Sequence, residues 1–209
     1  MAAVDNITHA KAALSNAVGA TATLEGGTFM RSKEAGKDGN NSGGNSYYTI
    51  ENYGSMSFGS GASVENAGHF SSMIRNGGKN TAESPAEMTI NGGTFIAENS
   101  FLNDYLSTAE TTLNDGYFGK ANYFGSGVGR LDIYGGCYGI EPYPSRSVSD
   151  DAPHGYTVIL SDVPGYPYQV VKKTNDVYAC AYPDSLPDVP KDHPMYYAPT
   201  TCQVDVLEA

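Results

Sequence analysis

The hexapeptide Ile90-Asn91-Gly92-Gly93-Thr94-Phe95 decides the fold that this sequence predicts, because close copies of it recur along the chain. Each copy has an aliphatic residue, a glycine three positions later and an aromatic residue five positions later. The copies run from Leu24 to Phe29, from Leu113 to Phe118 and from Ile133 to Tyr138. Repetition of this kind indicates a stacked repeat architecture.

Two further segments carry a variant of this unit that is one residue longer. They run from Ile50 to Met56 and from Val64 to Phe70, and they share the sequence Glu-Asn-x-Gly. Both keep an apolar residue after the glycine. We therefore interpret them as a second subtype of the same unit.

The glycine explains how both apolar anchors of a unit reach one core. Side chains alternate between the two faces of a strand, so anchors five positions apart point to opposite sides of a straight strand. Glycine accepts a positive φ or a bulge at little steric cost, and so turns the second anchor back. The predicted core residues are Leu24, Phe29, Ile50, Val64, Phe70, Ile90, Phe95, Leu113, Phe118, Ile133 and Tyr138.

The spacing of the aliphatic anchors favours a right-handed parallel β-helix over residues 20–140. The anchors at 24, 50, 64, 90, 113 and 133 are separated by 26, 14, 26, 23 and 20 residues. Most of these steps match one coil, and the short step suits two faces of one coil, which gives about five or six coils. The alternative is an antiparallel sandwich in which Gly-Gly marks hairpin turns, but such turns recur every 8 to 12 residues.

Both ends of the rod need a cap, because an open terminal coil exposes its core and unpaired backbone. Residues 1–19 are predicted to supply a capping helix, since apolar residues recur at helical spacing from 6 to 18 and Gly19 follows. Residues 141–209 hold ten of the eleven prolines and are predicted to form a small β and extended module. In it we expect strands at 156–160, 168–172 and 177–182, the last two joined by a hairpin at 173–176. The tail is expected to lie on its own rod or on a neighbouring subunit.

Composition and charge exclude several classes of partner and cofactor. The net charge is −11, and binding to nucleic acid or to an anionic membrane requires clustered Lys and Arg. No apolar run approaches the length of a membrane span. The three cysteines and four scattered histidines show no metal-ligand spacing, so we expect no metal site and no cofactor.

The sequence predicts no catalytic residues. The four arginines do not fall beside carboxylates in any repeated register, as a lyase would need. The adjacent pair Asp150-Asp151 lies in a Ser- and Pro-rich connection that is typical of a solvated turn. His69 follows a glycine but has no evident partner. We therefore expect that the chain is not an enzyme.

Tyrosine is the residue type most suited to binding here, because its ring is flat and amphipathic. The chain has 16 tyrosines and no tryptophan. Several of them lie outside the strict repeats and either form a contact surface or pack the lateral loops and the cap. These candidate surface residues are Tyr47, Tyr48, Tyr143, Tyr166, Tyr168, Tyr196 and Tyr197.

The segments LEGGTF, INGGTF and LNDGYF, with YYTIENYGSMSF between them, resemble the pectate-lyase-like β-helix repeats of gut-bacterial surface proteins and bacteriophage virion proteins. The resemblance covers roughly residues 7–140 and concerns the fold. The bacterial proteins of this kind are exported and anchored, whereas Met1 is followed by no secretory signal. The resemblance therefore implies a virion surface protein, which would be a capsid decoration, a head fibre or a baseplate-associated component. Its expected partners are other protein subunits, either of the capsid or copies of itself, and analogy alone suggests a homotrimer. The alternative is a bacterial cell-surface adhesin module that binds glycans or host protein, and a polysaccharide lyase or glycosidase is more remote.

Overall fold

The described part of the chain is all-β. A computed structural model describes residues 3–5, 11–31, 47–67, 72–78, 80–104, 108–121, 123–127, 129–140, 142, 155–179 and 201–207. Within these residues there are strands, turns and bends but no helix, and hence no helix that could cross a membrane.

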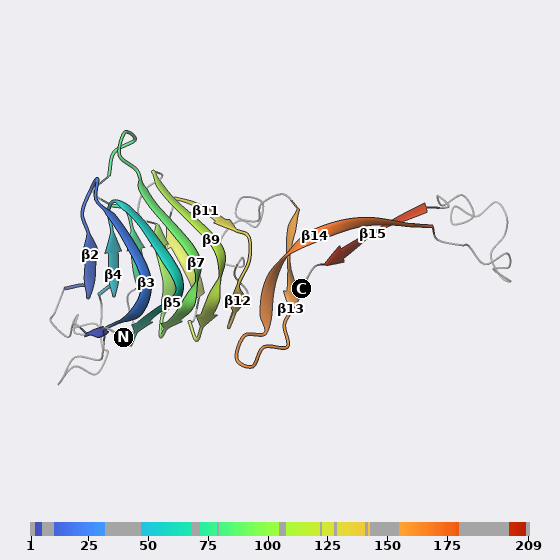
Figure 1. Ribbon diagram of the computed structural model, residues 1–209, viewed down its shortest axis with the longest axis horizontal. Coiled ribbons are helices and arrows are strands. Elements are labelled where there is room, and N and C mark those ends of the chain that lie inside the picture. Colours follow the sequence, from blue (N-terminus) through green and yellow to red (C-terminus); the bar gives the residue numbers. More distant parts are fainter. Residues whose placement is uncertain are drawn as a thin grey trace, which may run out of the picture.

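Two sheets of parallel strands form the body of the molecule (Figure 1). The smaller sheet consists of β2 (Leu14–Asn16), β4 (Ile50–Asn52), β6 (Ser72–Asn76), β8 (Ser100–Asp104) and β10 (Tyr123–Gly127). The parallel strands of the larger sheet are β1 (Ala3–Asp5), β3 (Thr21–Arg31), β5 (Ser55–Asn66), β7 (Ala86–Ala97), β9 (Ala109–Gly119), β11 (Arg130–Ile133) and β12 (Cys137–Tyr138). From β2 to β11 the chain alternates between the sheets, and we call each small-sheet strand with the large-sheet strand that follows it a rung.

Equivalent apolar residues of successive rungs stack on one another inside the body. The pairing of the large sheet aligns the first anchors, which are Leu24, Phe58, Ile90, Leu113 and Ile133. It aligns the second anchors as well, which are Phe29, Val64, Phe95, Phe118 and Tyr138. The rings of Phe95, Phe118 and Tyr138 stack nearly parallel, with centroids 5.1 and 4.8 Å apart. Such ring pairs contribute about 1 kcal/mol each beyond the burial of their apolar surface.

The second repeat subtype is wrong as a unit, because its residues belong to different strands. Ile50 lies in the small sheet, where it pairs with Leu14 and Ile74. Val64 takes the place of an aromatic second anchor in β5, and Phe58 takes the place of the aliphatic first anchor. The shared Glu-Asn therefore marks strand ends and not a repeat. The 14-residue step from Ile50 to Val64 does join the two strands of one rung, as expected.

The glycine three positions after each first anchor has the positive φ that the sequence argument requires. Its φ is 108° at Gly27, 106° at Gly93, 136° at Gly116 and 98° at Gly136. In β5 the chain makes the same bend with a change in pairing register between Phe58 and Ser63 instead. The extra residue of this strand explains why no copy of the hexapeptide is visible there.

The predicted N-terminal helix is wrong for residues 11–18. Leu14–Asn16 is strand β2, which pairs in parallel with Ile50–Asn52. Strand pairing outweighs the helical spacing of the apolar residues here. It places Leu14 against the core and Asn16 in a buried row of asparagines. Local propensity is a weak signal when a strand edge is available. Residues 6–10 of the predicted helix lie outside the described residues.

The C-terminal module continues the large sheet with antiparallel strands. β14 (Tyr168–Ala179) pairs with β12 and with β13 (Tyr156–Leu160), and its second half pairs with β15 (Thr201–Leu207). Val170 is 3% exposed and belongs to the core, so this module covers the last rung. The predicted hairpin at 173–176 is wrong: β14 runs straight through it, because β15 supplies the hydrogen-bonding partner.

Candidate binding surface

The outer face of the small sheet carries a buried glutamate that two tyrosines cover. Ile50 and Asn52 point inward from β4, so Glu51 between them faces outward. Its Oε1 accepts hydrogen bonds from Tyr47 Oη at 3.0 Å and from Tyr53 Oη at 2.7 Å. Glu51 is only 8% exposed. The two phenols thus replace the water that a surface carboxylate would bind.

Arg75 completes this cluster from the neighbouring strand. The register of β4 and β6 sets it opposite Glu51, and Arg75 Nη1 lies 3.8 Å from Glu51 Oε1. Its guanidinium carbon lies 5.6 Å from the ring centroids of both Tyr48 and Tyr53. An arginine so placed is attracted by the ring faces as well as by the carboxylate. We call Tyr47, Tyr48, Glu51, Tyr53 and Arg75 the tyrosine cluster.

The phenols of Tyr47 and Tyr53 stay protonated well above neutral pH. Burial raises the pKa of Tyr53, and the hydrogen bond to Glu51 and its negative charge raise it further. Burial, the charge of Glu51 and the hydrogen bond to it raise the pKa of Tyr47 in the same direction. Both hydroxyls therefore act as fixed donors.

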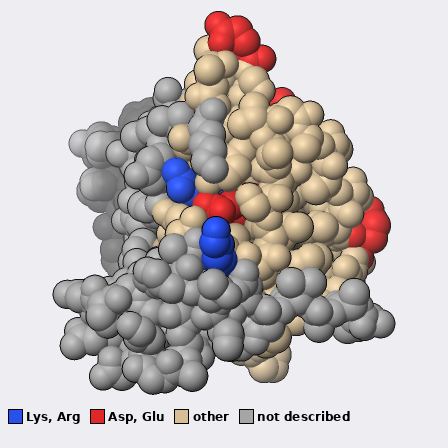
Figure 2. Space-filling view, turned by 90° about the vertical axis from the view of Figure 1, so that its left-hand side faces the viewer, with Lys and Arg blue, Asp and Glu red and all other residues tan. Residues whose placement is uncertain are grey.

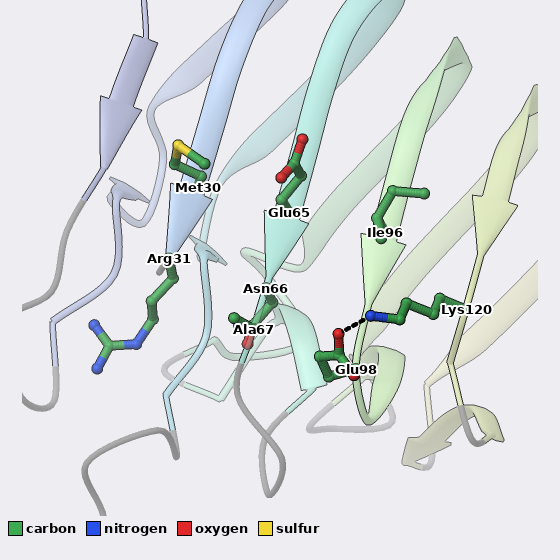
Figure 3. Close-up of a pocket in the computed structure, with 8 residues that line it drawn as sticks. All are labelled: Met30, Arg31, Glu65, Asn66, Ala67, Ile96, Glu98 and Lys120. Atoms are coloured by element: carbon green, nitrogen blue, oxygen red, sulfur yellow. Dashed lines mark hydrogen bonds and ion pairs between the residues drawn. The ribbon is translucent and has the colours of Figure 1, made fainter. Parts of the chain in front are cut away.

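A groove crosses the outer face of the large sheet where its strands end (Figure 3). Its volume is about 280 Å³. The outward row Met30, Glu65 and Ile96 lies on β3, β5 and β7, which are paired side by side. The remaining lining residues lie at or just after the ends of β3, β5, β7 and β9; they are Arg31, Asn66, Ala67, Glu98 and Lys120.

Charge in the groove is distributed unevenly. Lys120 is paired with Glu98 on one side, as the dashed line in Figure 3 shows. On the other side, Arg31 turns away from that pair: its Nη1 donates to Lys11 O at 2.7 Å, and its guanidinium carbon lies 5.7 Å from the ring centroid of Tyr47. Arg31 thus connects the groove to the tyrosine cluster.

Another pair of tyrosines lies on the large sheet, toward its C-terminal strands: Tyr117 belongs to β9, and Tyr166 precedes β14. Tyr117, which is 45% exposed, contacts Tyr166 edge to face with centroids 5.3 Å apart. Burial raises the pKa of Tyr166. Gly119 allows this contact, because a Cβ there would lie 3.3 Å from the Tyr166 ring and 2.9 Å from Ile96.

The structure brings only some of the candidate tyrosines together. Tyr47 and Tyr48 form an edge-to-face pair with centroids 5.5 Å apart. Tyr166 lies against Tyr117, and Tyr168 is partly buried against the core. The remaining candidates, Tyr143, Tyr196 and Tyr197, lie outside the described residues.

The predicted core residues lie where the repeat argument expects them, with a gradation toward the N-terminal end. Leu24 and Phe29 are only partly buried, because they belong to the first rung. Phe70 lies outside the described residues. The others are at most 4% exposed: Ile50, Val64, Ile90, Phe95, Leu113, Phe118, Ile133 and Tyr138.

Sequence reasoning missed Glu51, Arg75, Glu98 and Lys120 as site residues. Glu51 and Arg75 meet only through the pairing of two strands of different rungs. Lys120 and Glu98 meet in the same way after β9 and β7. No local sequence motif predicts either pair. Predicting them requires the register in which successive rungs pair.

In the described part of the chain, no group of three or more His, Cys, Asp or Glu side chains is placed to hold a metal ion. All four histidines and the pair Asp150-Asp151 lie outside it. Cys137 is a free, buried thiol whose pKa is raised by burial. A thiol of this kind is a poor nucleophile at neutral pH.

The face of the molecule at the N-terminal side of the stack is mostly neutral where described residues form it, with small basic and acidic patches close together (Figure 2). No family model, curated protein or solved structure matches the chain.

Proposed function

We propose that the chain is a non-enzymatic structural and binding protein on the surface of a bacteriophage virion, as a capsid decoration, a head fibre or a baseplate-associated component. We also propose that its rungs wind as a right-handed parallel β-helix. A connection between parallel strands of one sheet is right-handed in about 98% of cases. Each rung makes such a connection, because the chain leaves the large sheet, forms one small-sheet strand and returns parallel to its previous path.

The observation that carries the functional proposal is the arm formed by β14 and β15. Tyr168–Lys172 of β14 pairs with β13, whereas Lys173–Ala179 pairs with β15. This second half projects beyond the stacked rungs as a two-stranded ribbon (Figure 1). A two-stranded ribbon alone is at best marginally stable in water. We infer that another protein subunit of the particle packs against the arm.

A mass-spectrometric analysis of purified particles tests this proposal. The full chain should be present in them, and a chain that lacks residues 201–209 should be lost because the arm has no second strand. A full-length Glu87→Gln variant, altered at an exposed position of the body, serves as the control and should be retained. Equal incorporation of the truncated chain would show that the arm is not the docking element.

The neighbouring genes provide an independent test of the setting. Capsid and portal genes beside this one would support the virion proposal, whereas exported, sortase-type or S-layer genes would end it. Size-exclusion chromatography with light scattering would show whether the subunit bound by the arm is another copy of the chain.

One observation favours the alternative of a glycan-binding adhesin. The outer face of the large sheet carries a row of hydroxyl side chains in register: Thr23, Ser57, Thr89 and Thr112. Ser57 Oγ lies 3.4 Å from Thr23 Oγ1. Neutral hydroxyls at the spacing of strands, ~4.8 Å, can exchange hydrogen bonds with the hydroxyls of a polysaccharide. Binding to bacterial or host glycans that is lost in Thr89→Val would favour this alternative.

A further inference from the structure

The groove of Figure 3 combines apolar groups with two carboxylates, and of its two basic residues Lys120 pairs with Glu98 while Arg31 points away from that pair. Met30 and Ile96 offer apolar surface on either side of Glu65 in the same outward row. Lysine and arginine pack their methylene stems on apolar surface while the charged end reaches a carboxylate. The groove provides both kinds of contact.

Glu65 has a carboxylate available for such an end group. Among the residues that the structure describes, no Lys or Arg lies within ion-pair distance of it. The chain as a whole carries a net charge of −11, so a cationic partner is attracted toward it. Glu65 differs in this respect from Glu98, whose carboxylate Lys120 already pairs.

Lys120 shows that the groove holds an alkylammonium group. Its side chain, 60% exposed, reaches across the groove to Glu98. Its backbone has φ 74°, the one positive φ of a residue other than glycine in the described ranges. A left-handed backbone at a residue with a side chain costs free energy and is found at functional sites.

We propose that the groove binds a lysine or arginine side chain of a partner protein between Met30, Glu65 and Ile96, and that Lys120 is an internal competitor for the second carboxylate of the groove, that of Glu98. This goes beyond the proposed function, whose docking element is the arm. The volume of about 280 Å³ suits one long side chain with its adjoining backbone and lies below the usual range for a drug-sized ligand.

A titration with a fluorescein-labelled peptide, Gly-Gly-Ser-Arg-Ser-Gly-Gly, followed by anisotropy at low ionic strength tests the proposal. Glu65→Gln should weaken binding about tenfold, because a charge-assisted hydrogen bond is lost. Glu87→Gln removes the same charge from an exposed site on β7 and should change the affinity by less than about twofold. A peptide with norleucine in place of arginine should not bind.

The competitor is tested with a second matched pair. Lys120→Ala should strengthen binding of the arginine peptide several-fold, and Lys172→Ala, at an exposed lysine of β14, should not. Equal losses in Glu65→Gln and Glu87→Gln, or equal gains in both lysine variants, would mean general attraction to an acidic protein and would overturn the proposal. Displacement of the peptide by a neutral oligosaccharide would also overturn it, since the groove would then be a sugar site. The arm plays no part in these measurements, so their outcome and that of the particle test are independent.

Discussion

Asn52 Nδ2 donates a hydrogen bond to Asn76 Oδ1 at 2.8 Å, from the end of β4 to the end of β6. Asn16 Nδ2 donates to Asn52 Oδ1 in the same way at 2.9 Å. The three amides form a buried row that runs from rung to rung. Each amide also donates to backbone carbonyls at the entry to the large-sheet strands, so the row holds the turn between the two sheets in place.

Asn52→Ala should lower the free energy of unfolding by about 3 kcal/mol. The variant leaves the Glu87 carbonyl, the Gly54 amide and the Asn76 amide oxygen without their buried partner. Urea denaturation measures the change. Asn91→Ala is the matched control, because Asn91 is exposed although its Oδ1 accepts a hydrogen bond from Asn114 at 2.8 Å. A loss in Asn52→Ala as small as the control's ~0.5 kcal/mol would contradict a structural role of the row.

Phe95→Ala should lower the free energy of unfolding by about 4 kcal/mol. Phe95 is 1% exposed and contacts the rings of Phe58, Phe101 and Phe118. Thermal unfolding monitored by circular dichroism checks this. Thr94→Ala, at the adjacent position whose side chain points outward, should cost less than about 1 kcal/mol. Similar effects of the two substitutions would mean that Phe95 does not lie inside the stack.

Gly93→Ala should destabilise the chain by about 2 kcal/mol or more. The φ of Gly93 is 106°, and a Cβ there would lie 2.7 Å from the carbonyl oxygen of Ala62. Gly26→Ala, in the corresponding bend of the first rung, meets its nearest atom at 3.4 Å and should cost less than about 1 kcal/mol. Midpoints of urea unfolding distinguish the two. Equal destabilisation by both substitutions would contradict the claim that the bend requires a glycine at position 93.

Stability should fall at alkaline pH in part because Tyr53 ionises. Its pKa is raised in the folded state, first by burial and then by Glu51. The stabilisation from a raised pKa is complete below the ordinary tyrosine pKa of about 10 and is lost as the pH rises toward the folded value. Tyr53→Phe should be less stable at neutral pH by about 2 kcal/mol and should lose less stability on going to alkaline pH. Identical alkaline slopes of unfolding free energy for the two proteins would rule out this role.

The candidate sites lay beyond the reach of the sequence because they depend on register. The Glu51–Arg75 and Glu98–Lys120 pairs each join residues 22 or more positions apart, and a shift of one residue would point one partner into the core. The tyrosines were recognisable as contact residues by type, but the sequence could not say that Tyr47 and Tyr48 lie at one end of the stack and Tyr166 at the other.

The sequence by itself determined the class of fold, the core of the large sheet and the bend at Gly27, Gly93, Gly116 and Gly136, because alternation and the freedom of glycine act locally. Only the tertiary structure decided that Leu14–Asn16 is a strand, that Val64 takes the place of an aromatic second anchor and that residues 173–176 continue strand β14 without a turn. In each of these places a neighbouring strand supplied hydrogen bonds and buried surface. Pairing with a distant segment then outweighed the local preference of the chain.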